Sequence, residues 1–317
     1  MPFPFRRHAR RAAESLLTGN ARAVRRLLLL AGRERAPRLP EIVQIEATNI
    51  CNAKCTFCPR DDMTRRQGIM DWALYQKIVD ECAALGIGHV RMHNYGEAFV
   101  DKRLPEKIAY AKSKGIREVG VITNGSLLGP DVAKAVVEAG LDAINISLDA
   151  AGRETFEATR LGLMYDKVIA NVEGLVKIRR ELGRKRPKLI LSFVRQDNSA
   201  EEQAFIDHWS AVADKIHITE LHNWAGSRAR RADVNYPCYR QWLTFTVLWD
   251  GRVSLCCADL DGKVVLGDLS TQSIADVWNS DAYRRVRREQ LDSGGPEICR
   301  NCYLPAKDSP LWVAKLV

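Results

Sequence analysis

The middle of the chain alternates between two hydrophobic periods. Short runs rich in β-branched residues, apolar at every second position, predict strands, and the longer stretches between them carry apolar residues at helical spacing. The predicted strands are residues 42–47, 89–93, 118–123, 143–148, 189–194 and 216–220. The predicted helices are residues 71–85, 104–114, 131–139, 153–159, 166–182 and 201–212. This alternation indicates βα units around a parallel sheet, so we predict an α/β fold, a partial (β/α)6 TIM-like barrel.

The alternation stops near residue 223. Two apolar runs, residues 242–249 and 252–257, flank Asp250-Gly251, which is a strong signal for a β-hairpin. A helix is predicted over residues 273–288. The sequence therefore predicts an N-terminal helical extension (1–40), the partial barrel (41–222) and a small C-terminal hairpin-plus-helix domain (223–317).

The net charge of +9 is concentrated at the start of the chain, where residues 1–40 contain ten arginines against two acidic residues. Residues 41–317 are nearly neutral, so the sequence does not support a nucleic-acid-binding surface. The arginine-rich segment predicts a basic amphipathic helix over residues 6–33. It is either a solvated extension of the barrel or a contact, through residues 1–35, to an anionic membrane surface or a partner. A transit peptide would share this composition.

The chain contains nine cysteines, no signal peptide and no run of ~18 apolar residues that could span a membrane. We therefore expect a cytoplasmic protein in a reducing compartment. The cysteine spacing favours metal binding over disulfides.

Cys51, Cys55 and Cys58 lie within eight residues directly after the first predicted strand, with the spacing C-x3-C-x2-C. Three thiolates on one short loop can hold a [4Fe–4S] cluster, and they leave one iron open to a small molecule. A structural zinc site is the alternative, but it needs four closed ligands, and the triad has no fourth cysteine or histidine nearby.

The triad, with Phe57 before its last cysteine, resembles the signature of the radical S-adenosylmethionine (radical SAM) family. The resemblance implies that Cys51, Cys55 and Cys58 bind a [4Fe–4S] cluster, and that this cluster binds SAM. Reductive cleavage of SAM then gives a 5′-deoxyadenosyl radical, which abstracts a hydrogen atom from the substrate. An external one-electron donor such as flavodoxin or ferredoxin is implied as a partner.

The resemblance extends to the C-terminal ends of later strands, where βα barrels place their chemistry. Gly96-Glu97 stands where the family has a Gly-Gly-Glu-Pro stretch that binds the SAM amino group, although Tyr95 replaces the first glycine. Ser147 and Arg160 match family positions that contact the SAM ribose and carboxylate. Ordinary surface or capping roles are the alternative for these two residues.

Two histidines near the expected pocket, His93 and His222, are weaker candidates for substrate contact or proton transfer. The polar run at residues 195–198 follows the fifth predicted strand. In folds of this kind such residues lie near the adenosine.

A second cysteine set comprises Cys238, Cys256, Cys299 and Cys302. Its spacing, Cys238-x12-Gly251-x4-Cys256 and then C-x2-C, resembles the SPASM/twitch extension of radical SAM enzymes in its shorter, twitch form. The resemblance implies one fully ligated auxiliary [4Fe–4S] cluster, whereas a zinc ribbon would also use four thiolates. The spacing favours Cys256 over its neighbour Cys257 as the ligand, and Cys257 stays the alternative.

A closed cluster near a radical site suggests an electron acceptor. We therefore predict an oxidoreductase or epimerase that abstracts hydrogen from a small polyol, sugar or natural-product intermediate. Epimerisation would need a hydrogen-atom donor, for which the Cys257 thiol is the candidate. The alternatives are modification of a ribosomally made peptide, for which we find no docking domain of ~80 residues, a lipid-linked substrate at the membrane surface, and a non-catalytic iron–sulfur or zinc scaffold.

Overall fold

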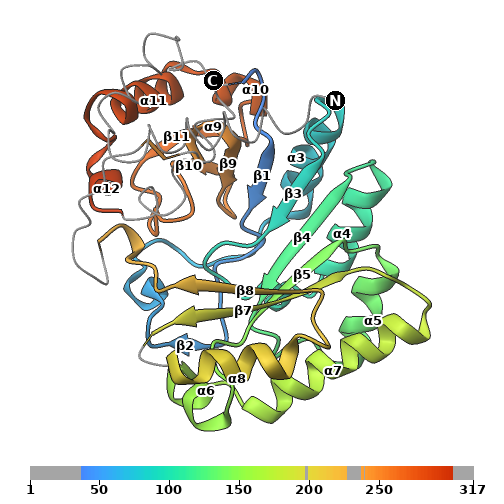
Figure 1. Ribbon diagram of the computed structural model, residues 1–317. Coiled ribbons are helices and arrows are strands. Elements are labelled where there is room, and N and C mark those ends of the chain that lie inside the picture. Colours follow the sequence, from blue (N-terminus) through green and yellow to red (C-terminus); the bar gives the residue numbers. More distant parts are fainter. Residues whose placement is uncertain (1–36, 197–198, 227–236, 239, 303–317) are drawn as a thin grey trace, which may run out of the picture. The chain divides into compact units, whose positions relative to one another are not determined.

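The computed structural model describes residues 37–196, 199–226, 237–238 and 240–302 (Figure 1). The predicted basic N-terminal helix lies outside the described residues, as do Asp197 and Asn198. By their contacts, the residues form two compact units. The barrel unit contains residues 41–221 and 246–274, and the small unit contains the described parts of residues 1–40, 222–245 and 275–317.

Six parallel strands form the centre of the barrel unit, and each overlaps its predicted range. In sheet order they are β1 (Ile42–Ile45), β3 (His89–Met92), β4 (Glu118–Thr123), β5 (Ala143–Ser147), β7 (Lys188–Arg195) and β8 (Lys215–Glu220). The connecting helices are α3 (Trp72–Ala84), α4 (Leu104–Ser113), α5 (Pro130–Glu138), α6 (Arg153–Thr159), α7 (Tyr165–Glu181) and α8 (Ser199–Trp209). The predicted α/β fold with a mostly parallel sheet is confirmed.

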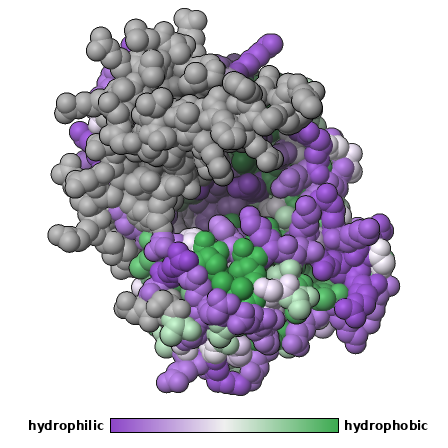
Figure 2. Space-filling view, viewed as in Figure 1, coloured by the Kyte–Doolittle hydropathy of each residue, from purple (hydrophilic) through white to green (hydrophobic). Residues whose placement is uncertain are grey.

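Local signals and burial account for these elements. Asp71 caps α3 by accepting hydrogen bonds from the N–H groups of Ala73 and Leu74 at 2.8 and 3.3 Å. Apolar strand side chains such as Val43 and Ile144 are 0% exposed, and burying each contributes roughly 1.5–3 kcal/mol. The outer surface over α5 and α7 is mainly hydrophilic (Figure 2). Because the strands are parallel, their C-terminal ends meet at one end of the barrel.

The predicted hairpin continues this sheet. Strands β9 (Thr244–Val247), β10 (Arg252–Ser254) and β11 (Val265–Asp268) are antiparallel and extend the sheet beyond β1 in the order β11-β10-β9-β1. The Glu46 N–H joins the two parts by donating to the Val247 carbonyl at 2.8 Å. The turn is at Asp250-Gly251 as predicted, and Gly251 has φ 94°, a conformation that favours glycine.

The small unit contains the helices α9 (Arg240–Leu243), α11 (Asp281–Ser293) and α12 (Glu297–Arg300), and all of α10 (Ile274–Trp278) after its first residue. The single helix predicted over residues 273–288 is wrong, because Ser280 interrupts it and caps α11 by accepting the Tyr283 N–H at 3.3 Å. The predicted start of the hairpin at Trp242 is also wrong. Trp242 is 0% exposed, and its helix α9 contacts α11, so burial overrides its β-propensity.

The core of the small unit is aromatic and includes one buried cation. The Arg287 guanidinium carbon lies 4.3 and 4.6 Å from the ring centres of Trp278 and Tyr283. Its Nε donates to the Gln241 carbonyl at 2.9 Å, and burial lowers its pKa to about 10. Cation–π contacts and carbonyl acceptors therefore compensate for the lost water.

Candidate functional site

The cysteine triad lies on the loop that leaves β1. The loop contains the short strand β2 (Lys54–Cys55) and is followed by the 3₁₀ helix η1 (Pro59–Asp62). All three thiols are half-buried. Burial raises their pKa values, that of Cys58 to about 11, and Cys55 and Cys51 raise the pKa of Cys58 further. The Cys58 N–H donates to the Cys55 carbonyl at 3.0 Å. Thiolates are the metal ligands, so iron must displace these protons when it binds.

Arg160 is placed beside the triad by a short strand pair. β2 pairs antiparallel with β6 (Arg160–Leu161), which sets Cys55 opposite Arg160. The Arg160 Nη1 is 3.7 Å from the Cys55 Sγ, and the guanidinium carbon is 5.5 Å from the centre of the Phe57 ring. The Nη2 forms a buried ion pair with Asp149. Arg160 and Phe57, both predicted to bind the cofactor, are therefore brought together at Cys55.

Asp149 has an uncommon backbone conformation. Its φ of 62° lies in the left-handed region, which is rare for a residue other than glycine. Its side chain is 0% exposed, and its Oδ1 accepts the Val194 N–H at 3.0 Å. Such a conformation persists where surrounding contacts enforce it. Here β7 and Arg160 supply those contacts.

The triad loop is also tied to the end of β4. The Asn52 Nδ2 donates to the Ser126 Oγ at 2.9 Å, and the Asn124 Nδ2 donates to the Asn52 Oδ1 at 3.0 Å. Neither contact is predicted from the sequence, where Asn124 is part of a turn signal. The Asn52–Asn124 contact spans 72 positions, so no local pattern in the sequence could indicate it.

Glu97, which is 2% exposed, joins the ends of β3 and β4. Its carboxylate accepts hydrogen bonds from the Thr123 Oγ1 at 2.6 Å, the Asn124 N–H at 2.7 Å and the Phe99 N–H at 3.1 Å. Burial raises its pKa. A carboxylate offers about four acceptor positions. Three are used here, which leaves one for an ammonium group such as the one that the family pattern implies.

Gly96 allows the segment after β3 to approach the start of the triad loop. A Cβ at this position would lie 2.2 Å from the Thr48 carbonyl oxygen and 2.9 Å from that of Ile50. The neighbouring Glu97 N–H donates to the same Ile50 carbonyl at 2.9 Å. The close approach is to the protein's own backbone, directly before Cys51.

Gly96→Ala is expected to push this backbone apart and to destabilise the protein by about 1–3 kcal/mol, the usual cost of overpacking. Iron bound per chain after anaerobic reconstitution should fall toward half of the wild-type value, the share of the triad cluster, because the triad loop begins at the displaced carbonyls. Iron assay and urea unfolding measure the two effects. Gly174→Ala on α7 is the matched control, since a Cβ there meets nothing within 4 Å. Equal iron content in both variants would contradict this role.

Tyr95 lies close to the triad and to the turn that follows β10. It is 5% exposed. Burial raises its pKa, and the neighbouring Cys257, Cys256 and Cys58 act in the same direction, Cys257 most strongly. The Cys256 Sγ accepts the Ala258 N–H at 3.4 Å. Tyr95 therefore interacts both with the thiol of Cys257, the predicted hydrogen-atom donor, and with Cys58 of the triad, all within the barrel unit. From the sequence alone, Tyr95 is only a departure from the family pattern.

A buried ion pair connects the segment after the triad to the same turn. Arg65, 4% exposed, donates to both carboxylate oxygens of Glu46, 0% exposed, at 2.6 and 2.5 Å. The Arg65 Nε donates to the Leu260 carbonyl at 2.7 Å, and the Asp261 carboxylate accepts the Arg65 N–H at 3.3 Å. We name this group the Glu46–Arg65 latch. It fixes the turn that carries Cys256 and Cys257.

The second cysteine set is divided between the two units. Cys238, Cys299 and Cys302 belong to the small unit, and Cys256 belongs to the barrel unit. Cys299 lies on α12, and the Cys302 N–H donates to its carbonyl at 3.1 Å. Cys238 and Cys302 are each 8% exposed. Three of the four predicted ligands thus share one compact unit.

The donor groups around the cysteines fit iron–sulfur clusters. Within the described part of the chain, no three His, Cys, Asp or Glu side chains converge closely enough to share one metal ion. Two buried donors, the Arg160 Nε and the Gln290 Nε2, have no hydrogen-bond partner among the described residues. Cluster sulfurs accept such hydrogen bonds.

The remaining predicted residues are Ser147, His93 and His222. Ser147 ends β5, half-buried, with Ser192 of β7 as its strand partner. His93 directly follows β3 and is half-buried. His222 belongs to the small unit, where burial and then Arg240 lower its pKa to about 4. At neutral pH His222 is therefore uncharged, and its Nδ1 accepts the Trp224 N–H at 2.6 Å.

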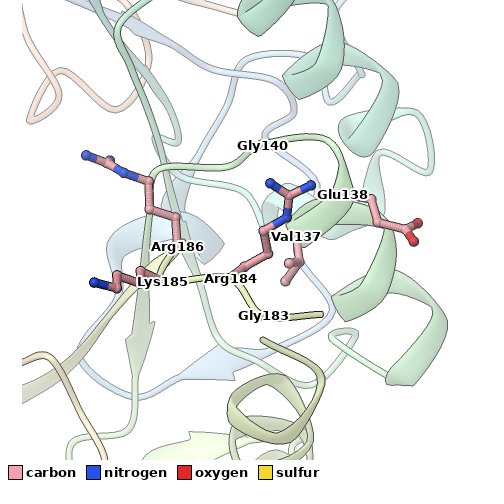
Figure 3. Close-up of a pocket in the computed structure, with 7 residues that line it drawn as sticks. All are labelled: Val137, Glu138, Gly140, Gly183, Arg184, Lys185 and Arg186. Carbon is pink, nitrogen blue, oxygen red and sulfur yellow. The ribbon is translucent and has the colours of Figure 1, made fainter. Parts of the chain in front are cut away.

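A surface pocket of ≈ 380 Å³ lies at the opposite end of the barrel, among the loops that precede β5 and β7. Its lining residues are Val137, Glu138, Gly140, Gly183, Arg184, Lys185 and Arg186. In Figure 3 the Lys185 and Arg186 side chains extend away from Arg184, and Arg186 is paired with Asp142 at 2.9 Å. The three cations do not converge, and the pocket is remote from the triad.

Comparisons with known proteins match both parts of the chain. The model of the Radical SAM superfamily matches residues 45–183, and that of the SPASM iron-sulfur cluster-binding domain matches residues 238–303. The S-adenosyl-L-methionine-dependent 2-deoxy-scyllo-inosamine dehydrogenase of Niallia circulans is 23% identical over 275 residues, which is 84% of this chain and 93% of that protein.

Two solved structures show the same fold. BtrN in complex with AdoMet and 2-DOIA has a TM-score of 0.59 at 20% identity, covering 83% of this chain and 93% of its own. SuiB of Streptococcus suis bound to the precursor peptide SuiA has a TM-score of 0.69 at 15% identity, covering 90% of this chain and 77% of its own.

Proposed function

Because the chain belongs to the radical SAM superfamily and carries a C-terminal SPASM iron–sulfur domain, we propose that it oxidises or epimerises a hydroxyl-bearing carbon in a small polyol, sugar or natural-product intermediate. The family predicted from the sequence is confirmed, as are the predicted cofactors, SAM and [4Fe–4S] clusters. The substrate class, the reaction type and the roles of individual residues are proposals.

The observation that carries the proposal is the buried Tyr95, which interacts with the thiol of Cys257 and with that of Cys58. When bound, SAM and its cluster supply a 5′-deoxyadenosyl radical that abstracts a hydrogen atom, and the auxiliary cluster supplies an acceptor for one electron. Cys51, Cys55 and Cys58 hold the first cluster. The free acceptor position of Glu97 receives the SAM ammonium, and Arg160 places positive charge beside Cys55.

The fate of the substrate radical separates the two reactions. In dehydrogenation the radical carbon loses an electron and its hydroxyl loses a proton, and a ketone forms. In epimerisation the S–H bond of Cys257 breaks and a C–H bond forms on the opposite face of the substrate. The resulting thiyl radical must then regain an electron and a proton, with a flavodoxin- or ferredoxin-type donor as the source. The dehydrogenase from Niallia circulans, named for an aminocyclitol, supports the small-polyol class.

A second candidate is the modification of a peptide. The peptide-bound SuiB structure has the higher TM-score, 0.69, of the two that we compare. In this case the same thiol would act on a peptide carbon, and the substrate would be an extended chain.

Incubation with SAM, a one-electron reductant and cyclitols or sugars deuterated at the carbinol carbon tests the proposal. We expect deuterium in 5′-deoxyadenosine and either a ketone or an inverted carbinol as the product. Hydrogen transfer to 5′-deoxyadenosine from peptides alone would support the second candidate instead. SAM cleavage that no polyol or sugar stimulates would also count against the first.

Cys257→Ala in deuterated water tests the thiol separately. If Cys257 returns the hydrogen atom, wild type incorporates solvent deuterium at the inverted carbon and the variant loses this signal by about 10²-fold or more, the scale of a lost proton-transfer group. Cys82→Ala is the matched control, because burial raises the pKa of the Cys82 thiol to about 12 and makes it inert. Full incorporation in Cys257→Ala would exclude Cys257 as the donor.

The membrane-surface alternative rests on residues 1–35, which lie outside the described residues. Among the described residues, no helix combines the length and the apolar character that crossing a bilayer requires. Liposome binding that persists after deletion of residues 1–35 would count against a lipid-linked substrate held by this segment.

A further inference from the structure

Gln290 is a buried side chain in the last turns of α11, and the oxygen of its carboxamide already accepts a hydrogen bond. The residue is 1% exposed. Its Oε1 accepts the Cys238 N–H at 3.0 Å. Because oxygen and nitrogen occupy fixed places on a planar amide, this bond determines where the two Nε2 hydrogens lie.

The Nε2 lies beside Cys299. A Cβ built on Gly295 would lie 2.2 Å from the Gln290 Nε2 and 3.0 Å from the Cys299 Cβ. The amide nitrogen and the Cys299 side chain therefore border the same small space above Gly295. The Nε2 has no hydrogen-bond partner among the described residues. A buried donor without an acceptor destabilises the folded state, so the Nε2 requires an acceptor that the described residues do not supply.

Two glycines create this arrangement. Gly294 and Gly295 have φ values of 87° and 93°, which only glycine adopts easily. They end α11, and the Gly295 N–H donates to the Glu289 carbonyl at 2.9 Å. The chain then reverses through Pro296 into α12, which returns Cys299 to the Gln290 amide. A side chain at Gly295 would fill the space that the amide occupies.

We propose that Gln290 is a positioning residue of the auxiliary cluster. Its Oε1 holds the Cys238 backbone, and its Nε2 donates a hydrogen bond to a sulfur of the cluster. The acceptor is either a ligating thiolate or a bridging sulfide. The inference rests on the proposed function, because it assigns Cys238 and Cys299 to that cluster. Hydrogen bonds to cluster sulfurs stabilise the reduced state and raise the potential, so Gln290 makes the cluster a better electron acceptor.

Gln290→Glu keeps an oxygen for the Cys238 N–H and replaces the donor by an oxygen of a negative group. We expect the equilibrium constant for reduction of the auxiliary cluster to fall about tenfold or more, which corresponds to ~59 mV for a one-electron couple. EPR-monitored redox titration of the full-length enzyme measures this. The auxiliary signal is recognised because SAM does not alter it. Gln272→Glu, the same change at an exposed turn, should leave the potential unchanged.

An unchanged potential in a cluster-bearing Gln290→Glu variant would overturn the proposal. If that variant does not retain the cluster, the neutral Gln290→Met is titrated instead, with a smaller fall expected. A further measurement needs no variant: with ¹⁵N in the glutamine amides, pulsed EPR of the reduced auxiliary cluster in wild type should show a ¹⁵N coupling. Absence of this coupling would also overturn it. A wild-type enzyme with only one cluster would contradict the auxiliary-cluster assignment itself, which is a distinguishable outcome.

Discussion

Simultaneous replacement of Cys51, Cys55 and Cys58 by alanine is expected to abolish SAM cleavage and to remove about half of the bound iron. The three cysteines lie within eight residues on one loop of the barrel unit, whereas Cys238, Cys299 and Cys302 belong to the small unit. The loss should therefore be confined to one cluster. Without the cluster nothing reduces SAM, so 5′-deoxyadenosine formation should fall to the uncatalysed rate, by about 10⁶-fold or more.

The measurement combines iron and acid-labile sulfide analysis, EPR of the reduced protein and chromatography of 5′-deoxyadenosine after anaerobic reconstitution. Cys82→Ala again controls for the loss of a thiol. Residual SAM cleavage in the triple variant would show that the triad is not the radical site. Zinc in wild type at the Cys238–Cys302 set would remove the auxiliary redox role. SAM cleavage by wild type also disposes of the non-catalytic scaffold alternative.

Hydrophobic periodicity was sufficient to predict the barrel. Strand and helix positions follow from short-range alternation, and buried residues such as Val43 and Ile144 come from that pattern. The cysteine sets were equally accessible, because ligand spacing is written in the sequence. The errors at Trp242 and Ser280 have local causes. Burial in the small unit decides the first, and a capping hydroxyl decides the second.

The contacts that position the site could not be predicted in the same way. Asn52 meets Asn124 over 72 positions, and Cys238 meets Gln290 over 52. Each partner, taken alone, resembles an ordinary polar residue. Glu97 illustrates the difference, because the family pattern implied a ligand contact and the structure adds three hydrogen bonds that join two strands. Only the fold brings such residues together.

Loss of one partner of the Glu46–Arg65 latch is expected to be the most destabilising change outside the cysteines. Glu46→Leu leaves the Arg65 guanidinium, 4% exposed, without its carboxylate. Removing one member of a buried ion pair costs about 3–5 kcal/mol. The Asn94 Nδ2 and the Trp249 N–H also lose their acceptor, at 3.1 and 3.2 Å in the wild type. Anaerobic urea unfolding of the reconstituted enzyme measures the loss.

The double variant Glu46→Leu/Arg65→Met distinguishes the contribution of the latch to stability from its role in positioning the cysteine turn. Because an apolar pair of similar volume often replaces a buried ion pair at little cost, we expect the double variant to recover most of the stability lost in Glu46→Leu. It should not recover full activity, because it lacks the hydrogen bond of 2.7 Å from the Arg65 Nε to the Leu260 carbonyl, which fixes the cysteine turn in the wild type. Arg153→Met, which breaks an exposed pair with Asp166, should match wild type in both measurements. Full activity in the double variant would mean that the latch stabilises the barrel without positioning Cys256 and Cys257.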